Sequence, residues 1–260
     1  MIDDGLVAPR ALLLDFGGVV VTGTRRPGWD AEFAAEIRTR FALAGFDAPD
    51  EERIRRDVGY GRDAEKRWKN AMSRPREPKE LTHRQFWADF VAADWPAPAL
   101  ALVTAEATEL CRRMAELARE LTFRPGLADL LDVADAHRVP VGIVSNALCG
   151  AVHRDHLRAN GMGARFAVQV YSDEIGIRKP HPGMIEAAAA ALDVPVAATW
   201  YVGDNIDRDV LCARRAGAGA AILVEDEGTH NPPFQPYVEA DALLPDLDAL
   251  RALLLKALQG

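Results

Sequence analysis

The chain has 260 residues, of which 49% are hydrophobic and 27% are charged, a balance typical of a folded globular protein. Its formal net charge of −8 argues against a general nucleic-acid or membrane-surface binder, because no excess of basic residues is available to pair with phosphates. The longest apolar stretches, such as 187–192 and 218–224, are far too short to span a bilayer.

The N-terminal segment and the cysteines bear on the cellular compartment. Met1-Ile2-Asp3-Asp4-Gly5 is acidic and lacks the basic and apolar regions of a secretory signal. Cys111, Cys149 and Cys212 are odd in number and show neither metal-ligand nor redox spacing, which is simplest in a reducing compartment. We therefore expect a cytoplasmic protein with neither a nucleic-acid nor a membrane partner. A small anionic substrate is compatible with the acidic charge, because a bound divalent cation reverses the local sign.

The N-terminal part of the chain combines one buried strand with a long helical stretch. Ala11–Leu14 is uniformly apolar and is predicted to be a strand, and a second apolar run, 19–21, follows two glycines. From about Thr24 to about Glu120 the pattern is helical and contains four of the five tryptophans. The helical periods lie at 29–44, 51–72, 84–93 and 99–117. We expect Trp29, Trp68 and Trp87 to form the core of this stretch.

From Arg124 onward, short apolar strands alternate with helices. Strands are predicted at 139–144, 166–170, 199–202 and 220–224. Helices are predicted at 127–137, 152–160, 183–192, 210–216 and 247–258. This alternation predicts an α/β fold with a doubly wound parallel sheet, to which the first strand must belong because it cannot bury both faces alone. The predicted domains are an α/β core at 1–23 and 119–260 and an inserted α-helical domain at 24–118.

Polar residues follow the predicted strands at the point where each strand ends. Asp15 to Gly18 follow the first strand, Ser145-Asn146 follow the strand at 139–144, and Lys179 lies beyond the strand at 166–170. The strand at 199–202 leads into Gly203-Asp204-Asn205, with Asp209 five positions after Asp204. Ligands of open parallel sheets bind outside the carboxyl ends of the strands. We therefore expect these side chains to converge at one edge of the sheet.

These residue types suit phosphoryl transfer. Carboxylates and a backbone carbonyl can hold Mg²⁺, which neutralises phosphoryl oxygens and stops Asp15 from repelling a dianion. Asp15 can then attack phosphorus and form an aspartyl-phosphate. Ser145 and nearby backbone amides would bind phosphoryl oxygens, while Lys179 supplies a fixed positive charge to the transition state. Gly17 and Gly18 allow the backbone to approach the phosphoryl group closely.

In this order the segments resemble the four motifs of the haloacid dehalogenase-like hydrolase superfamily. The motifs are Asp15-Phe16-Gly17-Gly18-Val19, Ser145-Asn146, Lys179-Pro180 and Gly203-Asp204-Asn205-Ile206-Asp207-Arg208-Asp209. Pro125-Gly126 and Ala216-Gly217 are also similar to this family. The resemblance covers about 9–23 and 120–258, and the inserted domain resembles, by position, the helical cap of the phosphatase-rich branch.

The resemblance implies a role for each of these residues. Asp15 would be the nucleophile and a metal ligand, the Gly17 carbonyl a second ligand and Asp204 a third. Asp209 would complete the metal site from a supporting position, orienting Lys179 or a metal-bound water. Ser145 and Lys179 would bind and stabilise the phosphoryl group, with Gly18 and Asn146 as further substrate-binding residues. The implied cofactor is Mg²⁺, and the implied substrate is a small phosphorylated metabolite.

One position departs from the family pattern. Most phosphatases of this family carry a second aspartate two residues after the nucleophile as general acid and base, and this chain has Gly17 there. General acid–base catalysis is typically worth about 10²–10⁴-fold, so the loss is large unless the inserted domain or His181 supplies a proton. Some relatives similar to the Asp-Phe-Gly-Gly-Val form are thought to work without that aspartate.

Two alternatives to a phosphatase stay open on the sequence. Dehalogenase relatives also lack the second aspartate, although Gly203-Asp204 is a metal-binding arrangement that halide displacement does not need. A catalytically weak protein that binds a phosphorylated ligand is the other alternative. Outside the motifs, Arg25, Arg26 and Arg62 are placed to reach a substrate from the inserted domain. His153, His156 and His230 are expected on solvated surfaces, because no third ligand lies near the first two in sequence.

Overall fold

The computed structural model describes residues 5–47 and 49–260, so residues 1–4 of the predicted core, within the acidic N-terminal segment, lie outside the described residues. A six-stranded parallel sheet forms the centre, with the strand order β5-β4-β1-β6-β7-β8. The strands are β1 (Ala11–Leu14), β4 (Val141–Ser145), β5 (Val168–Tyr171), β6 (Thr199–Gly203), β7 (Ala220–Val224) and β8 (Ala242–Leu244). The short β8 strand, which pairs with β7, was missed by the sequence analysis.

Helices cover both faces of the sheet because the side chains of each strand alternate between faces. Leu12 and Leu14 pack in one hydrophobic cluster with α6 (Leu127–Ala136), α7 (Gly150–Ala159) and α11 (Leu247–Gln259). Leu13 packs in another cluster with α9 (Gly183–Ala191) and α10 (Leu211–Ala216). The predicted doubly wound α/β fold is confirmed. The short helical segments of this part are η2 (Gly163–Arg165), α8 (Ser172–Ile175), η3 (Val196–Ala198) and η4 (Ile206–Val210).

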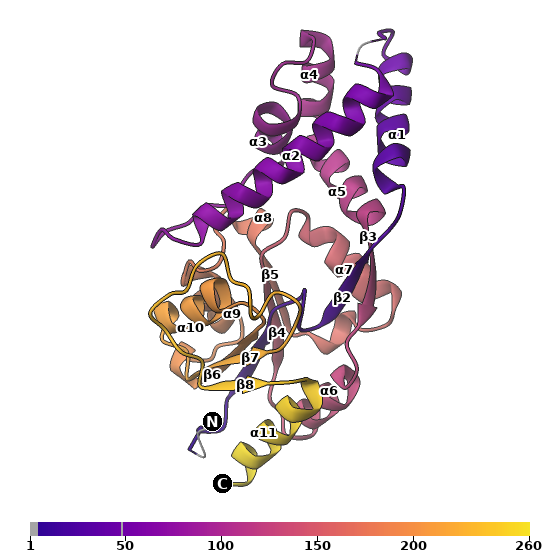
Figure 1. The fold of residues 1–260 in the computed structure, drawn as a ribbon. Helices are drawn as coiled ribbons and strands as arrows, with labels where there is room; N and C mark the ends of the chain where they lie inside the picture. Colours follow the sequence, from indigo (N-terminus) through magenta and orange to yellow (C-terminus); the bar gives the residue numbers. More distant parts are fainter. Residues whose placement is uncertain (1–4, 48) are drawn as a thin grey trace.

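A two-stranded antiparallel ribbon joins the sheet to the helices at the other end of the molecule (Figure 1). It consists of β2 (Val21–Arg25) and β3 (Arg119–Phe123), with Val21 opposite Phe123 and Arg25 opposite Arg119. The sequence analysis missed this ribbon and extended the helical stretch into it. Its strands are largely polar and exposed beyond Val21, so they lack the apolar alternation that marks a half-buried strand.

Between the two ribbon strands lies a helical region, residues 29–118, with a hydrophobic cluster of its own. Trp29 and Trp87 are buried in that cluster and Trp68 packs against it, as predicted. The predicted helix at 99–117 is interrupted at Glu106, and the one at 84–93 is largely a π-helix. The elements are α1 (Trp29–Leu43), α2 (Glu51–Met72), α3 (His83–Gln85), η1 (Phe86–Val91), α4 (Ala97–Ala105) and α5 (Ala107–Ala118).

The helical region touches the sheet domain at a second place, through the segment 73–82. The Glu80 backbone N–H donates to Gly176 O at 3.0 Å, and Lys79 forms a β-bridge with Ile177. The Glu80 carboxylate accepts hydrogen bonds from Arg178 at 2.6 Å and from Ser172 at 2.5 Å. Because the side chains of Glu80 and Arg178 are buried, this ion pair is shielded from solvent. It anchors the helical region beside the loop that carries Lys179.

Among the described residues, the helices are all too short or too polar to cross a bilayer.

Candidate active site

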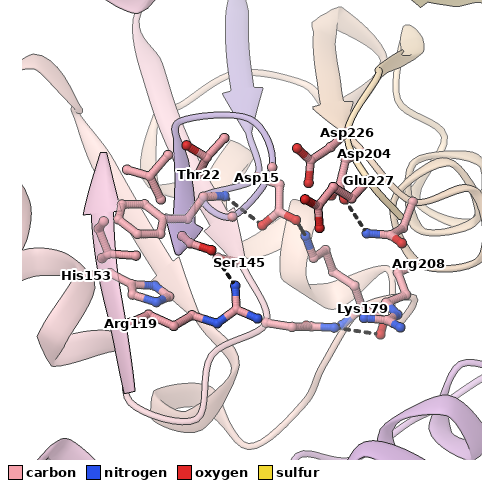
Figure 2. Close-up of a pocket in the computed structure, with 18 of the residues that line it drawn as sticks. Asp15, Thr22, Arg119, Ser145, His153, Lys179, Asp204, Arg208, Asp226 and Glu227 are labelled. Carbon is pink, nitrogen blue, oxygen red and sulfur yellow. Dashed lines mark hydrogen bonds and ion pairs between the residues drawn. The ribbon is translucent and has the colours of Figure 1, made fainter. Parts of the chain in front are cut away.

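The strand ends gather the predicted residues around one cavity of about 680 Å³ (Figure 2). Asp15 directly follows β1, Ser145 ends β4, and Asp204 follows β6. Lys179 enters from the loop between α8 and α9. Gly17, Gly18 and Asn146 line the same cavity, whereas Asp209 lies beneath it in contact with Lys179. The structure therefore brings all the predicted site residues together at the carboxyl edge of the sheet, the place where open α/β sheets bind ligands.

Lys179 is the centre of a buried polar network. Its Nζ atom lies 2.9 Å from Asp15 Oδ2 and 2.7 Å from Asp209 Oδ1, and it donates to Tyr201 OH at 2.7 Å. The Lys179 side chain is only 1% exposed. Burial alone would lower the pKa of Lys179, but the facing carboxylates of Asp15 and Asp209 outweigh it and raise the pKa. The ammonium group is therefore a fixed positive charge at the nucleophile.

Asp209 organises the loop that follows β6. Its Oδ2 atom accepts hydrogen bonds from the backbone N–H groups of Asp204 at 3.2 Å and Asn205 at 2.9 Å. Its Oδ1 atom accepts from Lys179 and from Tyr201. Gly203 is required for this contact, since a Cβ atom there would fall 2.2 Å from the Asp209 side chain. Because both oxygens already accept two hydrogen bonds, the geometry favours a supporting position for Asp209.

Asp204 keeps one oxygen without a partner. Its Oδ2 atom accepts from Asn205 Nδ2 at 2.7 Å, while its Oδ1 atom is buried and has no hydrogen-bond partner in the described structure. Gly18 makes room for this carboxylate, since its φ is +79° and a Cβ atom would lie 2.6 Å from Asp204 Cγ. Carboxylate oxygens of Asp15, Asp204 and Asp209 lie within 4.8 Å of one another. A buried orphan oxygen in such a cluster suits a hard divalent cation.

The electrostatics of the cluster are unfavourable without a cation. Burial raises the pKa of Asp15, and Asp209 adds to this effect, although Lys179 opposes it. Burial, with Asp209 and Asp15 nearby, raises the pKa of Asp204 to about 8. Three carboxylates thus face one ammonium group, an excess of negative charge that a divalent cation would offset.

Ser145 and Asn146 occupy different positions although they are adjacent in sequence. Ser145 is 2% exposed and lines the cavity at the end of β4. The Asn146 side chain accepts from the Lys179 backbone N–H at 2.7 Å and donates to Lys179 O at 3.1 Å. Both polar ends of this amide therefore position Lys179. Substrate binding by Asn146 stays a prediction.

The comparison with known families agrees with this geometry. A family model described as haloacid dehalogenase-like hydrolase matches residues 9–217. The chain belongs to this family. The matched residues include the end of β1, Ser145, Lys179 and the loop after β6, and the family model describes a hydrolase.

Individual relatives of this hydrolase include phosphatases. It is 30% identical to the phosphoserine phosphatase of Thermus thermophilus over 166 residues, which are 60% of this chain and 65% of that protein. It is 25% identical to the phosphoglycolate phosphatase of Escherichia coli over 80% of this chain and 78% of that protein. A 2-haloacid dehalogenase from Pseudomonas syringae has the same fold, with a TM-score of 0.58, 17% identity and coverage of 95% of this chain and 98% of that chain. The chain thus spans slightly less than two thirds of the Thermus relative.

Several lining residues of the hydrolase were missed by the sequence analysis. In Figure 2, Asp226 and Glu227 lie on the side of Asp204, whereas Arg119 and His153 lie on the opposite side of Asp15. Other missed lining residues are Val21, Thr22, Gly23, Thr24 and Leu121, whereas Phe16, Asn205 and Arg208 belong to the predicted motifs but had no predicted role. Asp226 and Glu227 follow β7, so the rule that polar residues follow strand ends also applies to them. The ribbon residues carry no comparable signal.

The expectation that His153 lies on a solvated helix face is wrong. Its ring stacks on Phe16 at a centroid distance of 4.1 Å, and its Nδ1 atom is buried without a partner among the described residues. Burial lowers the pKa of His153 to about 3, so the ring is neutral at physiological pH. His156 is also partly buried, with its ring near Phe123. The helix α7 packs against the site, which its sequence pattern does not reveal.

The structure shows the surroundings of Gly17 and of His181, the residue suggested as a replacement acid. A Cβ atom on Gly17 would have no neighbour within 4 Å among the described residues, so the missing side chain leaves open space in the cavity. His181 lies outside the cavity lining, and its Nδ1 atom accepts from the Gly183 backbone N–H at 3.0 Å. The suggestion that His181 supplies the proton is therefore not supported by this geometry.

Proposed function

We propose that this hydrolase is a Mg²⁺-dependent phosphomonoesterase that cleaves a small phosphorylated metabolite through an aspartyl-phosphate on Asp15. The observation that carries the proposal is the position of Asp15. Its carboxylate contacts the buried Lys179 ammonium group and belongs to the same carboxylate cluster as Asp204. A nucleophile, a fixed cation and a vacant carboxylate oxygen are the parts that phosphoryl transfer needs. The phosphatases among its relatives support the same reaction class.

The carboxylate cluster fits the proposed metal. Asp15, Asp204 and the Gly17 carbonyl would hold Mg²⁺, with Asp209 in support, and the orphan Oδ1 atom of Asp204 is the observation that favours this. When bound, Mg²⁺ would neutralise the phosphoryl oxygens and the excess negative charge of the site.

Asp15, Lys179 and Ser145 have separate roles in the proposed reaction. A carboxylate oxygen of Asp15 attacks phosphorus, the bond to the leaving oxygen breaks, and water later hydrolyses the aspartyl-phosphate to regenerate Asp15. Lys179 stabilises charge on the transferring group and keeps Asp15 oriented, while Ser145 binds a phosphoryl oxygen. Because Gly17 provides no acid, the leaving oxygen departs without a proton from that position. The enzyme should therefore favour acidic leaving groups.

The domain division completes the proposal. We propose that residues 24–118 act as a cap on a core formed by 1–23 and 119–260, since the helical region has its own hydrophobic cluster. The contact of Glu80 with Arg178 restricts how far such a cap moves about the ribbon. We also propose a cytoplasmic location, which the three unpaired, buried cysteines support.

Asp204 favours the phosphatase over the alternative dehalogenase. Halide displacement from a 2-haloacid needs no metal, whereas the orphan Oδ1 atom of Asp204 suits one. Chelation of Mg²⁺ separates the two reactions, because it abolishes phosphate release and spares halide release. The shared fold with a dehalogenase does not decide between them.

The test is a panel of phosphorylated metabolites assayed for phosphate release with Mg²⁺. We expect release from at least one phosphomonoester by the wild type and a loss of roughly a thousandfold or more in Asp15→Asn. Asp132→Asn, which changes a surface carboxylate paired with Arg165, is the matched control and should keep wild-type activity. Equal release by Asp15→Asn and the wild type would overturn the proposal. Tight ligand binding without turnover would favour the catalytically weak binding protein instead.

A further inference from the structure

A second cavity adjoins the candidate active site, and three of its seven lining residues are arginines. It has a volume of about 210 Å³ and is called the arginine cavity below. Its lining residues are Arg25, Trp29, Gly59, Arg62, Asp63, Ala118 and Arg119. Arg119 also lines the larger cavity that contains Asp15. The two cavities therefore meet at the Arg119 side chain, at the junction of the ribbon and the helical region.

Two of these arginines lie directly opposite each other on the ribbon. Arg25 of β2 pairs in register with Arg119 of β3. Residues at opposite positions of an antiparallel pair project from the same face, and like charges there are destabilising. Arg119 lies across Gly23, to whose carbonyl oxygen it donates at 3.1 Å, and a Cβ atom on Gly23 would fall 3.2 Å from Arg119 Cδ. The ribbon thus holds two positive charges side by side.

The third arginine reaches the same cavity from α2. The guanidinium carbon of Arg62 lies 5.1 Å from the ring centroid of Trp29, which is itself buried. Burial lowers the pKa of Arg62, and Arg119 and Arg25 lower it further, although Glu65 acts in the opposite direction. The three arginines therefore line one small cavity, in which Arg62 is half-buried and Arg25 and Arg119 are exposed.

Two other arginines near the junction of the ribbon and the helical region are neutralised by glutamates, in contrast to these three. Arg26 pairs with Glu32, and Arg113 pairs with Glu36 at 2.6 Å. The Arg25 side chain makes no hydrogen bond or ion pair with any described residue. The arginine cavity has one acidic lining residue among the described ones, Asp63. Guanidinium groups without carboxylate partners bind carboxylates and phosphates through paired hydrogen bonds.

We propose that the arginine cavity binds a second anionic group of the substrate, a carboxylate or a second phosphate, while Asp15 receives the phosphoryl group. This inference rests on the proposed phosphatase function and specifies its substrate class. The substrate is a phosphomonoester whose leaving group carries an anion on a short chain. Arg119 lines both cavities, so it marks the path between the phosphoryl group and this second anion.

A matched substrate series tests the inference through hydrolysis. The series consists of ω-carboxyalkyl phosphates with one to four methylene groups and of alkyl phosphates of equal length. We expect kcat/KM to be about tenfold or more higher for the carboxylate at one chain length, and Arg25→Gln and Arg62→Gln each to reduce that ratio about tenfold. Arg113→Gln, which changes an arginine that is paired with Glu36 and lines neither cavity, should keep the wild-type ratio. Melting temperatures confirm that each variant is folded.

A binding experiment separates this inference from the proposed function. The corresponding carboxyalkyl and alkyl phosphonates cannot be hydrolysed, and calorimetry with Mg²⁺ measures their affinities without turnover. If the phosphatase proposal fails, no ester is cleaved but the carboxyl phosphonate still binds more tightly. If the inference fails, esters are cleaved and the carboxylate gives no advantage. Equal affinity of the two phosphonates for the wild type, or an advantage retained in both Arg25→Gln and Arg62→Gln, would overturn it.

Discussion

Two charged regions lie side by side in this molecule and are built on opposite principles. Around Lys179, the positive charge is enclosed by the carboxylates of Asp15 and Asp209 and is almost fully buried. In the arginine cavity, Arg25 and Arg119 lie opposite each other without an enclosing set of carboxylates. The first region is an assembled network of opposite charges. The second is a cluster of like charges, to which we propose that an anionic group of the substrate binds.

This difference indicates how the chain divides catalysis from recognition. The network around Lys179 comes from β1, β6 and the segments that follow the strands, where backbone hydrogen bonds tie the Asp15 and Asp209 segments to the core. The arginine cavity comes from the ribbon and α2, where a substitution does not disturb the sheet. Removal of a charge should therefore destabilise the protein in the first region and stabilise it in the second.

The largest expected effect on stability comes from Lys179→Met. This substitution leaves Asp15 and Asp209 buried without their cation, and breaking such a buried pair costs about 3–5 kcal/mol in the free energy of unfolding. Urea denaturation in EDTA at pH 8 measures the change, with the exposed Lys66→Met as control. A loss below about 1 kcal/mol would show that the network does not stabilise the fold.

A gain of activity is expected from Gly17→Asp, because the cavity has space for the side chain. The new carboxyl group can protonate the leaving oxygen, so kcat for alkyl phosphates should rise about a hundredfold and kcat for aryl phosphates much less. Steady-state rates across a series of leaving groups measure the effect. Gly17→Asn is the matched control, since it fills the same space without a proton to donate. An equal gain in both variants would exclude acid catalysis as the cause.

The pH dependence of Mg²⁺ binding reports on Asp204. Its pKa is raised from 3.8 to about 8, so between these values the folded metal-free protein binds more protons than the unfolded chain. The free energy of unfolding should fall as the pH rises through this window, and Mg²⁺ affinity should rise by up to about tenfold per pH unit until about pH 8. Calorimetric titration at pH 6, 7 and 8 tests this. Asp204→Asn should weaken binding at least about tenfold and flatten the slope; an unchanged slope would contradict the assignment.

The smallest effect is expected from Arg25→Gln, which relieves the like-charge pair with Arg119. In low salt the variant should be more stable than the wild type by about 0.2–1 kcal/mol. Arg26→Gln should instead be neutral or slightly destabilising, because it removes an ion pair with Glu32. Thermal unfolding of the two variants gives the comparison. Destabilisation by Arg25→Gln would show that this arginine has a structural partner.

The sequence predicted the first region far better than the second. Asp15, Ser145 and Asp204 lie at or just after strand ends, so the sheet alone brings them together, and the loop between α8 and α9 adds Lys179. The ribbon was missed because its strands are polar and exposed, and Arg119 therefore had no predicted position. Contacts of this kind depend on how distant segments pack, which local patterns do not encode.

The surroundings of His153 and Glu80 could not be predicted from the local sequence pattern for the same reason. His153 lies on a helix with many polar residues, and only the packing of α7 shows that it stacks on Phe16. Glu80 lies in an irregular segment, where nothing in the neighbouring sequence indicates a buried ion pair with Arg178. Burial decides the environment of both side chains, and burial is a property of the tertiary structure.

The central claim is that Asp15 becomes phosphorylated during turnover. The most direct measurement is rapid acid quenching of the enzyme with a cleavable phosphomonoester and Mg²⁺, followed by borohydride reduction and peptide mass spectrometry. Reduction converts an aspartyl-phosphate into homoserine, so the account predicts homoserine at position 15 of the wild type and none without substrate. Substrate turnover with Asp15 unmodified at every quench time, or with the label on another residue, would contradict it.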